Sequence, residues 1–227
     1  LEHCIRDNLN YSAERRLAVL KPLKVVIENF PEGKIEWLPA LNNPNSDKQE
    51  QREIPFSREI WIEHDDFMEE PSKKFFRLAP GKEVRLRYAF FVTCNAVIKD
   101  EDGEIVELRC SYDPETRGGN APDGRKVKGT IHWVSAEHAK DAEVRVYNSF
   151  YNTPSPGRDR DFIEDINPNS LEVLENCKIE PDLIALNDNV PIQFERLGYI
   201  YKDPDTKPEK HIYNRTISLR DTWNKKL

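Results

Sequence analysis

The sequence lacks the short motifs that mark common catalytic sites. It has no phosphate-binding P-loop, no GxGxxG turn, no GxSxG nucleophile motif and no HExxH zinc motif. Its four cysteines and five histidines are scattered, with no CxxC pair and no cluster at metal-ligand spacing. The sequence therefore gives no indication of a catalytic centre or a bound metal.

Long apolar runs are also absent. No stretch approaches the roughly 18–20 apolar residues of a membrane span, and the first residues do not form a charged and then apolar leader. We therefore expect no membrane association and a cytoplasmic location. The 227 residues, 37% of them hydrophobic, suffice for one large or two modest domains with a buried core.

Positive charge is in deficit. The formal net charge is −7 and the pI is near 5.4, which argues against indiscriminate binding to nucleic acid. Any contact with RNA must then depend on a local cationic patch. The acidic balance favours an alternative function, a β-barrel module that binds another protein and does not recognise RNA.

One cationic patch is predicted in residues 75–92, where apolar and charged side chains alternate with the period of a half-buried strand. The apolar positions are Val84, Leu86 and Tyr88. The cations that this stretch gathers are Arg77, Lys82, Arg85 and Arg87. A guanidinium can pair with a phosphate or a guanine edge through two hydrogen bonds, but such arginines can also be the solvated face of an ordinary strand.

Short runs rich in β-branched residues recur between turn-forming segments. Besides the stretch above, the predicted strands are 23–30, 36–41, 54–67, 105–112, 126–135, 171–179, 192–202 and 211–220. This rhythm predicts a mainly β fold built as an antiparallel barrel or sandwich. Residues 1–20 have helical spacing instead, and Ser12 can cap a second helix over 13–20 that Pro22 ends.

Six segments, taken in order, resemble the anticodon-binding region of the glutaminyl-tRNA synthetases. They are PLKVVIENF, IPFSREIWIEHDDF, RLAPGKEVRLRYAFFV, DGRKVKGTIHWVSAEHA, IQFERLGY and YNRTISLRDTW. The resemblance covers nearly all 227 residues. It implies two antiparallel β-barrels, proximal and distal, with a helical linker over 1–21, a first barrel unit over 22–135 and a second over 136–227, between which strands can be exchanged.

The resemblance also implies partners. The catalytic half of the family carries HIGH-type and MSK-type signatures that bind ATP, and this sequence, which begins just after where that half would end, contains neither. We therefore expect a monomeric, non-catalytic region that holds no cofactor. It would bind the anticodon loop of a glutamine tRNA and act with its own catalytic domain, for which ATP is a substrate.

The resemblance assigns the middle anticodon base to Arg15 and Gln193 and the third base to Arg77. A glutamine amide offers both a donor and an acceptor and suits the edge of uracil, whereas arginine suits the acceptors of guanine. Without the resemblance, Arg15 could be a surface helix residue, Gln193 an amide satisfied by its neighbours, and Arg77 a surface charge.

The remaining implied contacts lie around the first base and the loop. Arg85, with Arg87 beside it, would lie near the first base, and Asn10 and Asn45 would lie close to the anticodon loop. Asn45 could instead serve only as a turn former. The sequence departs from the family at Phe76, where a lysine can stand, and an aromatic ring there could stack on a splayed base.

Other conspicuous residues are predicted to be structural. The basic run 124–129 resembles a phosphate-gripping loop, but a hairpin leading into a core strand accounts for it equally. Asp65 and Asp66 resemble a carboxylate pair, which we interpret as solvated acid. The tryptophans expected to pack in the core or between the barrels are Trp61, Trp133 and Trp223.

Overall fold

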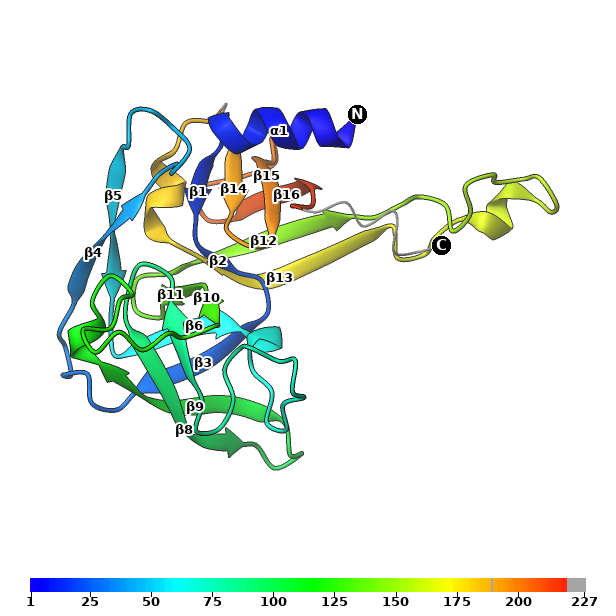
Figure 1. Cartoon of the computed structure of the whole chain (residues 1–227). Coiled ribbons are helices and arrows are strands. Elements are labelled where there is room, and N and C mark those ends of the chain that lie inside the picture. The colour runs from blue at the N-terminus through cyan, green and yellow to red at the C-terminus, as the bar shows by residue number, and fades with distance from the viewer. Residues whose placement is uncertain (189, 220–227) are drawn as a thin grey trace.

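The fold is built on two seven-stranded sheets, each curled into a nearly closed barrel (Figure 1). The structure is a computed structural model, and it describes residues 1–188 and 190–219. Helix α1 (Glu2–Ser12) and a separate hairpin of β4 (Glu36–Leu41) and β5 (Gln51–Phe56) complete the fold. The predicted mainly β architecture with two barrels and an N-terminal helix is confirmed.

The N-terminal barrel is the sheet built around residues 22–135. In order across the sheet, its strands are β10 (Thr130–Ile131), β7 (Glu83–Leu86), β8 (Phe91–Lys99), β9 (Ile105–Asp113), β3 (Pro22–Ile27), β6 (Glu59–Glu63) and β11 (Trp133–Ser135). The short 3-10 helices η1 (His64–Asp66) and η2 (Pro114–Thr116) follow β6 and β9.

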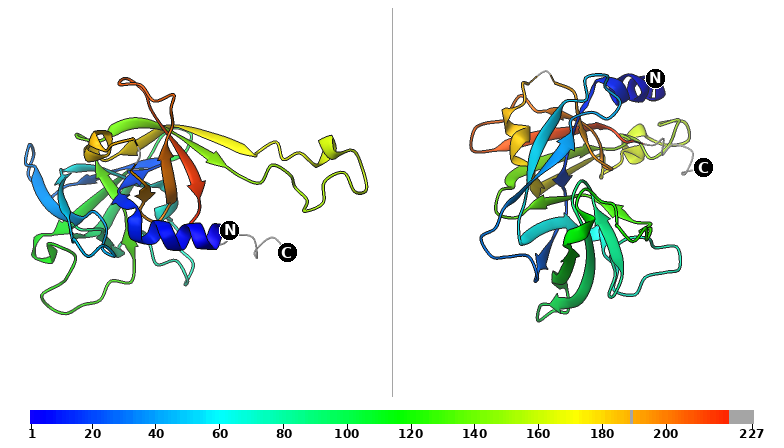
Figure 2. Two further views of the ribbon diagram at one scale, coloured as in Figure 1. Left: turned by 90° about the horizontal axis from the view of Figure 1, so that it is seen from above. Right: turned by 60° about the vertical axis from the view of Figure 1, so that its left-hand side comes forward.

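The C-terminal barrel combines late strands with two from the start of the chain. Its order is β1 (Glu14–Arg16), β14 (Ile192–Phe194), β15 (Gly198–Lys202), β16 (His211–Ile217), β12 (Lys140–Tyr147), β13 (Leu171–Ile179) and β2 (Ala18–Val19). The 3-10 helix η4 (Pro181–Ala185) follows β13. The connection from β12 to β13, with η3 (Phe162–Asp165), projects from the body of the molecule (Figures 1 and 2).

The strand pairing is mixed rather than purely antiparallel. β1 pairs with β14 and β12 with β16 in parallel, as do β10 with β7 and β3 with β9. All four parallel pairs join strands that are not consecutive in the chain. The antiparallel pairing expected from hairpin turns therefore holds only for part of each barrel.

Aromatic side chains fill the N-terminal barrel. Phe56 lies at the centre, with ring centroids of Phe30, Phe90 and Trp133 at 5.1–5.2 Å. Edge and tilted contacts at this spacing are the favourable arrangement for aromatic rings. Trp133 is buried as predicted, whereas Trp223 and the last residue of the predicted closing strand, Arg220, lie outside the described residues.

Several predicted elements are wrong in detail. Residues 13–20 form β1 and β2 rather than a second helix, because both strands pair with the distant β14 and β13. Two predicted single strands, 54–67 and 192–202, are each broken by a turn. The alternation in 75–92 stops at Tyr88, which has a left-handed backbone (φ 65°) between β7 and β8.

Within residues 1–188 and 190–219, no helix is both long and apolar enough to cross a membrane.

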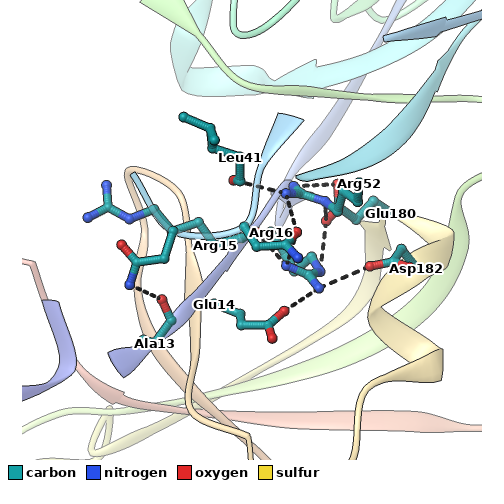
Figure 3. A network of polar contacts seen from close by, with 10 residues as sticks. Ala13, Glu14, Arg15, Arg16, Leu41, Arg52, Glu180 and Asp182 are labelled. Atoms are coloured by element: carbon teal, nitrogen blue, oxygen red, sulfur yellow. Dashed lines mark hydrogen bonds and ion pairs between the residues drawn. The ribbon is translucent and has the colours of Figure 1, made fainter. Parts of the chain in front are cut away.

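A buried carboxylate ties the hairpin to the C-terminal barrel (Figure 3). Glu180 accepts hydrogen bonds from Arg52 Nε at 2.8 Å and from Arg52 Nη2 at 3.0 Å, and Arg16 Nε lies 3.3 Å from Glu180 Oε1. Burial raises the pKa of Glu180, and the charges of Arg52 and Arg16 oppose that rise. Arg16 Nη2 also contacts two further carboxylates, Glu14 of β1 (Oε2, 2.5 Å) and Asp182 of η4 (Oδ2, 3.0 Å). The network joins β1, β5 and η4.

We expect the substitution Glu180→Gln to lower the free energy of unfolding by about 3–5 kcal/mol, because it leaves two buried guanidinium groups without their shared carboxylate. Urea unfolding of the chain measures the change. The control is Asp182→Asn, which removes a 40% exposed partner of Arg16 and should cost less than about 1 kcal/mol. Equal costs for the two variants would contradict the role given to Glu180.

Candidate nucleic-acid interface

A groove of about 760 Å³ is bordered by both barrels. One wall comes from α1, β1 and the β14–β15 hairpin of the C-terminal barrel. Arg87 and Thr130 contribute from the N-terminal barrel. Four of the predicted site residues line this groove, namely Asn10, Arg15, Arg87 and Gln193.

Arg15 and Gln193 lie side by side at the centre of this wall. They are direct partners in the parallel pair β1–β14, and Gln193 in turn opposes Tyr199 on β15. Partners on neighbouring strands point to the same face, about 4.8 Å apart, so these three side chains form one row in the groove. In the described part of the chain the Gln193 amide makes no side-chain hydrogen bond.

The next residue along β1 points the other way. Figure 3 shows Arg15 directed away from the buried network that holds Arg16, as the alternation of a strand requires. Arg15 Nη2 donates to Asn10 Oδ1 at 3.1 Å. Arg15 is therefore a strand residue whose guanidinium turns toward α1, and not the helix residue that the sequence predicted.

One face of α1 forms the edge of the groove. His3, Arg6, Asp7 and Asn10 all line it, and their spacing of three and four residues places them on the same side of a helix. Arg6 Nε donates to Ser218 O at 2.8 Å, which holds the helix to the end of the C-terminal barrel. The first three of these residues were not predicted from the sequence, although helical spacing from Asn10 indicates them.

The loop after β4 fixes the C-terminal end of α1. Asn43 Nδ2 donates to Tyr11 O at 3.1 Å and to Ala13 O at 2.9 Å, and Asn45 Nδ2 donates to Asn10 O at 3.2 Å. Carbonyls at a helix end otherwise lack partners. Asn45 thus contacts α1 next to the groove without lining it, and the buried Asn43 is a positioning residue that the sequence analysis missed.

Arg87 reaches the groove from the turn after β7. Its Nε forms an ion pair with Glu195 Oε2 at 2.9 Å, and the Tyr88 hydroxyl donates to the other oxygen of that carboxylate. Burial and the adjacent Glu195 raise the pKa of Tyr88 to about 12, so the hydroxyl remains a donor at neutral pH. These contacts join a turn of the N-terminal barrel to the β14–β15 turn of the C-terminal barrel.

Arg77 lies beyond the groove lining but is connected to it. The Asp66 carboxylate binds Arg196 through two contacts (Nη1–Oδ2, 2.5 Å; Nη2–Oδ1, 2.7 Å), and Arg77 Nε lies 3.3 Å from Asp66 Oδ1. Arg196 lines the groove and has a left-handed backbone (φ 68°). The prediction that Asp66 is solvated acid is wrong, because the residue is 1% exposed and carries two arginines.

Arg85 is a half-buried member of the predicted cationic patch. Its guanidinium lies over the Phe91 ring, 5.4 Å from the centroid, and its Nε is buried without a hydrogen bond in the described part of the chain. Its register partner across β7 and β10 is Thr130, which lines the groove. Arg85 therefore lies one strand from the groove lining.

The groove lining has more arginines than carboxylates, in an acidic molecule. The lining includes four arginines, Arg6, Arg15, Arg87 and Arg196, against two carboxylates, Asp7 and Glu195, although the whole chain carries a net charge of −7. Fold and site together define a double β-barrel module with an arginine-lined groove where the barrels meet.

Comparison with known proteins identifies the module further. Residues 13–113 match the family described as tRNA synthetases class I (E and Q), anti-codon binding domain, and residues 130–203 match a second family with the same description. The chain therefore belongs to the anticodon-binding family of the class I tRNA synthetases for glutamate and glutamine, and it corresponds to the anticodon-binding region of the glutaminyl enzyme.

Curated relatives agree with this assignment. The glutamine–tRNA ligase of Bradyrhizobium diazoefficiens is 58% identical over 227 residues, and that of Nitrobacter winogradskyi is 55% identical over 225. The ligase of Aliivibrio fischeri is 52% identical over 224 residues. These alignments cover 98–100% of this chain and 40% of each relative, so the chain spans about two fifths of the length of the relatives it matches.

We expect Asn43→Ala to loosen the end of α1, because it removes the amide that donates to the carbonyls of residues 10, 11 and 13. Loss of a buried donor to several carbonyls should cost about 1–3 kcal/mol. Hydrogen exchange of residues 2–13 should become faster. The matched control, Asn29→Ala, removes an exposed amide near β9; equal acceleration in α1 for both variants would contradict the capping role.

Proposed function

We propose that this chain binds the anticodon loop of a glutamine tRNA in the groove between the barrels. The observation that carries this proposal is the direct pairing of Arg15 with Gln193 in a groove lined by four arginines. Unpaired bases of RNA loops are recognised by groups that meet their Watson–Crick edges. A free amide and a guanidinium in one row supply such groups, and the surrounding arginines supply contacts to phosphate.

The residue roles in this proposal follow the resemblance. Gln193 and Arg15 contact the middle base, with the Gln193 amide facing both a donor and an acceptor of uracil. Arg77 contacts the third base from beyond the groove lining. Arg77 and the groove residue Arg196 both form ion pairs with Asp66. This shared carboxylate supports a position of Arg77 at one end of the bound loop.

The first base is assigned to the other arginines of the stretch 75–92. Arg85 lies near this base with Arg87 beside it, and Asn10 and Asn45 lie close to the loop. The hydrogen bonds between Arg15 and Asn10 and between Asn45 and Asn10 support a common location for these groups.

In the full-length protein, this region would present the tRNA to a catalytic domain that ligates glutamine to it with ATP. We propose that the whole protein is a cytoplasmic monomer. The matched relatives, each named as a glutamine–tRNA ligase, support the ligase activity proposed for the full-length protein.

Replacing Gln193 by Ala should weaken binding of an RNA stem-loop that carries the glutamine anticodon by about 1–3 kcal/mol, because a base-edge contact is lost. The loss should be smaller for a stem-loop whose middle anticodon base is changed, so that discrimination falls. Titration at fixed moderate salt measures both affinities. Gln51→Ala, an exposed glutamine on β5 outside the groove, is the control.

Two outcomes would contradict this proposal. An equal loss of affinity for every stem-loop would exclude base readout by Gln193. If the unmodified chain shows no RNA binding at tens of micromolar, which is within the usual range of non-specific binding, the alternative of a protein-interaction module becomes the better explanation.

A further inference from the structure

An aromatic side chain stands exposed next to Arg77. Phe76 is 51% exposed, and Lys128 Nζ lies 4.9 Å from the centroid of its ring. We propose that Phe76, together with Lys128, is a stacking subsite for an unpaired RNA base at the Arg77 end of the groove. This inference rests on the proposed function, because it requires that the groove binds a single-stranded RNA loop.

The backbone under the ring is held tightly. A Cβ atom on Gly129 would lie 2.0 Å from Phe76 O, so only glycine allows the strand to approach this closely. On the other side, Arg77 Nη1 donates to Asp65 O at 2.9 Å, and Arg77 Nε contacts Asp66. The Phe76 ring is thus presented to solvent from a fixed backbone rather than from a free loop.

The backbone that carries Phe76 lies close to the groove lining. Gly129, which packs on Phe76, precedes Thr130 of the groove lining, and the neighbouring Arg77 shares the Asp66 carboxylate with the lining residue Arg196. Two independent contacts therefore connect the position of Phe76 to the N-terminal-barrel side of the groove.

The chemistry fits a base more closely than a second protein surface. Every nucleobase has a π face that stacks on an aromatic ring, with little dependence on its identity. Lys128 Nζ lies over the face of the ring, so a base that stacks on that face displaces the ammonium group, which can then meet the phosphate of the same nucleotide. None of the assigned site residues lies in the basic run 124–129. This inference gives one residue of that run, Lys128, a role in binding.

Replacing Phe76 by Leu should weaken binding of the glutamine-anticodon stem-loop about 5- to 100-fold, because stacking on one base is lost. Phe76→Tyr should bind like the unmodified chain, since the aromatic face is retained. The matched control is Phe162→Leu, which changes a phenylalanine of similar exposure on the projecting η3. Far-ultraviolet circular dichroism and urea unfolding establish that each variant is folded.

Abasic stem-loops identify the stacked base. A series of stem-loops is prepared, each lacking one base of the loop. Phe76→Leu should lower the affinity for all of them except one, because in that stem-loop the base that stacks on Phe76 is already missing. Changing the identity of that base should alter affinity little. A Phe76→Trp variant should show quenching of its added fluorescence on binding the intact loop, and less quenching with the abasic loop at that position.

The two proposals fail in different ways. If Phe76→Leu binds every stem-loop as tightly as the unmodified chain while Gln193→Ala loses discrimination, the stacking subsite is wrong and the anticodon proposal stands. If Phe76→Leu weakens all abasic loops equally, the ring does not stack on a particular base and the inference is also overturned. If the unmodified chain binds no stem-loop, both proposals fall.

Discussion

Carboxylates buried where the barrels meet set the geometry on which the rest of the structure depends. Asp66 of the N-terminal barrel binds Arg196 of the C-terminal barrel, and Glu195 of the C-terminal barrel binds Arg87 and Tyr88 of the N-terminal barrel. A buried carboxylate without its partner is costly. The two barrels can therefore satisfy these groups in only a narrow range of relative positions. Because the groove has one wall on each barrel, its width is set by the same ion pairs.

The same carboxylates divide the arginines into two kinds. Arg77, Arg87 and Arg196 are held by Asp66 or Glu195, so their planes are oriented while part of their charge is neutralised. Arg15 and Arg85 have no carboxylate partner among the residues that the structure describes. A ligand in the groove thus meets guanidinium donors of fixed orientation and only a few guanidinium charges that no carboxylate neutralises. In a chain with a net charge of −7, this favours a ligand whose shape matches the groove over any polyanion.

Local pattern predicted two of the strands to the residue. The bounds of β4 and β13 agree with the predicted segments 36–41 and 171–179. The prediction failed at residues 13–20, where apolar spacing suited a helix. This segment forms strands because it pairs with distant residues, Arg15 with Gln193 and Ala18 with Ile179. A local sequence pattern cannot predict pairing over such a separation.

The pairing at the centre of the candidate site was predictable only through resemblance. Arg15 and Gln193 were placed together by likeness to a family, and nothing in their own segments indicated contact. Groove residues such as Arg6 and Arg196 were missed because their roles depend on the helix face and on a turn between strands. The division into units 1–21, 22–135 and 136–227 stays a prediction, although β1 and β2 of the first segment pair with strands of the last.

The position of the groove follows from how each barrel closes. In both sheets the two edge strands are consecutive in the chain, separated by one buried residue: Leu17 between β1 and β2, and His132 between β10 and β11. Each closing segment therefore bends at that residue and supplies both edges of its barrel. Each also supplies a groove residue just before the bend, Arg15 and Thr130.

The closing bend of the N-terminal barrel is bound to the groove itself. Arg196 Nη1 lies 3.0 Å from His132 Nδ1, and since an arginine can only donate, Nδ1 is the acceptor and the ring proton lies on Nε2. That nitrogen then donates to Glu63 Oε1 at 3.2 Å, whose carboxylate also accepts from the backbone N–H groups of residues 20 and 21, just after β2. One chain of hydrogen bonds thus runs from the groove through one barrel closure to the segment that closes the other. A change in the shape of the groove would therefore break hydrogen bonds at the segments that close the two barrels. The geometry of the groove is coupled in this way to both barrels.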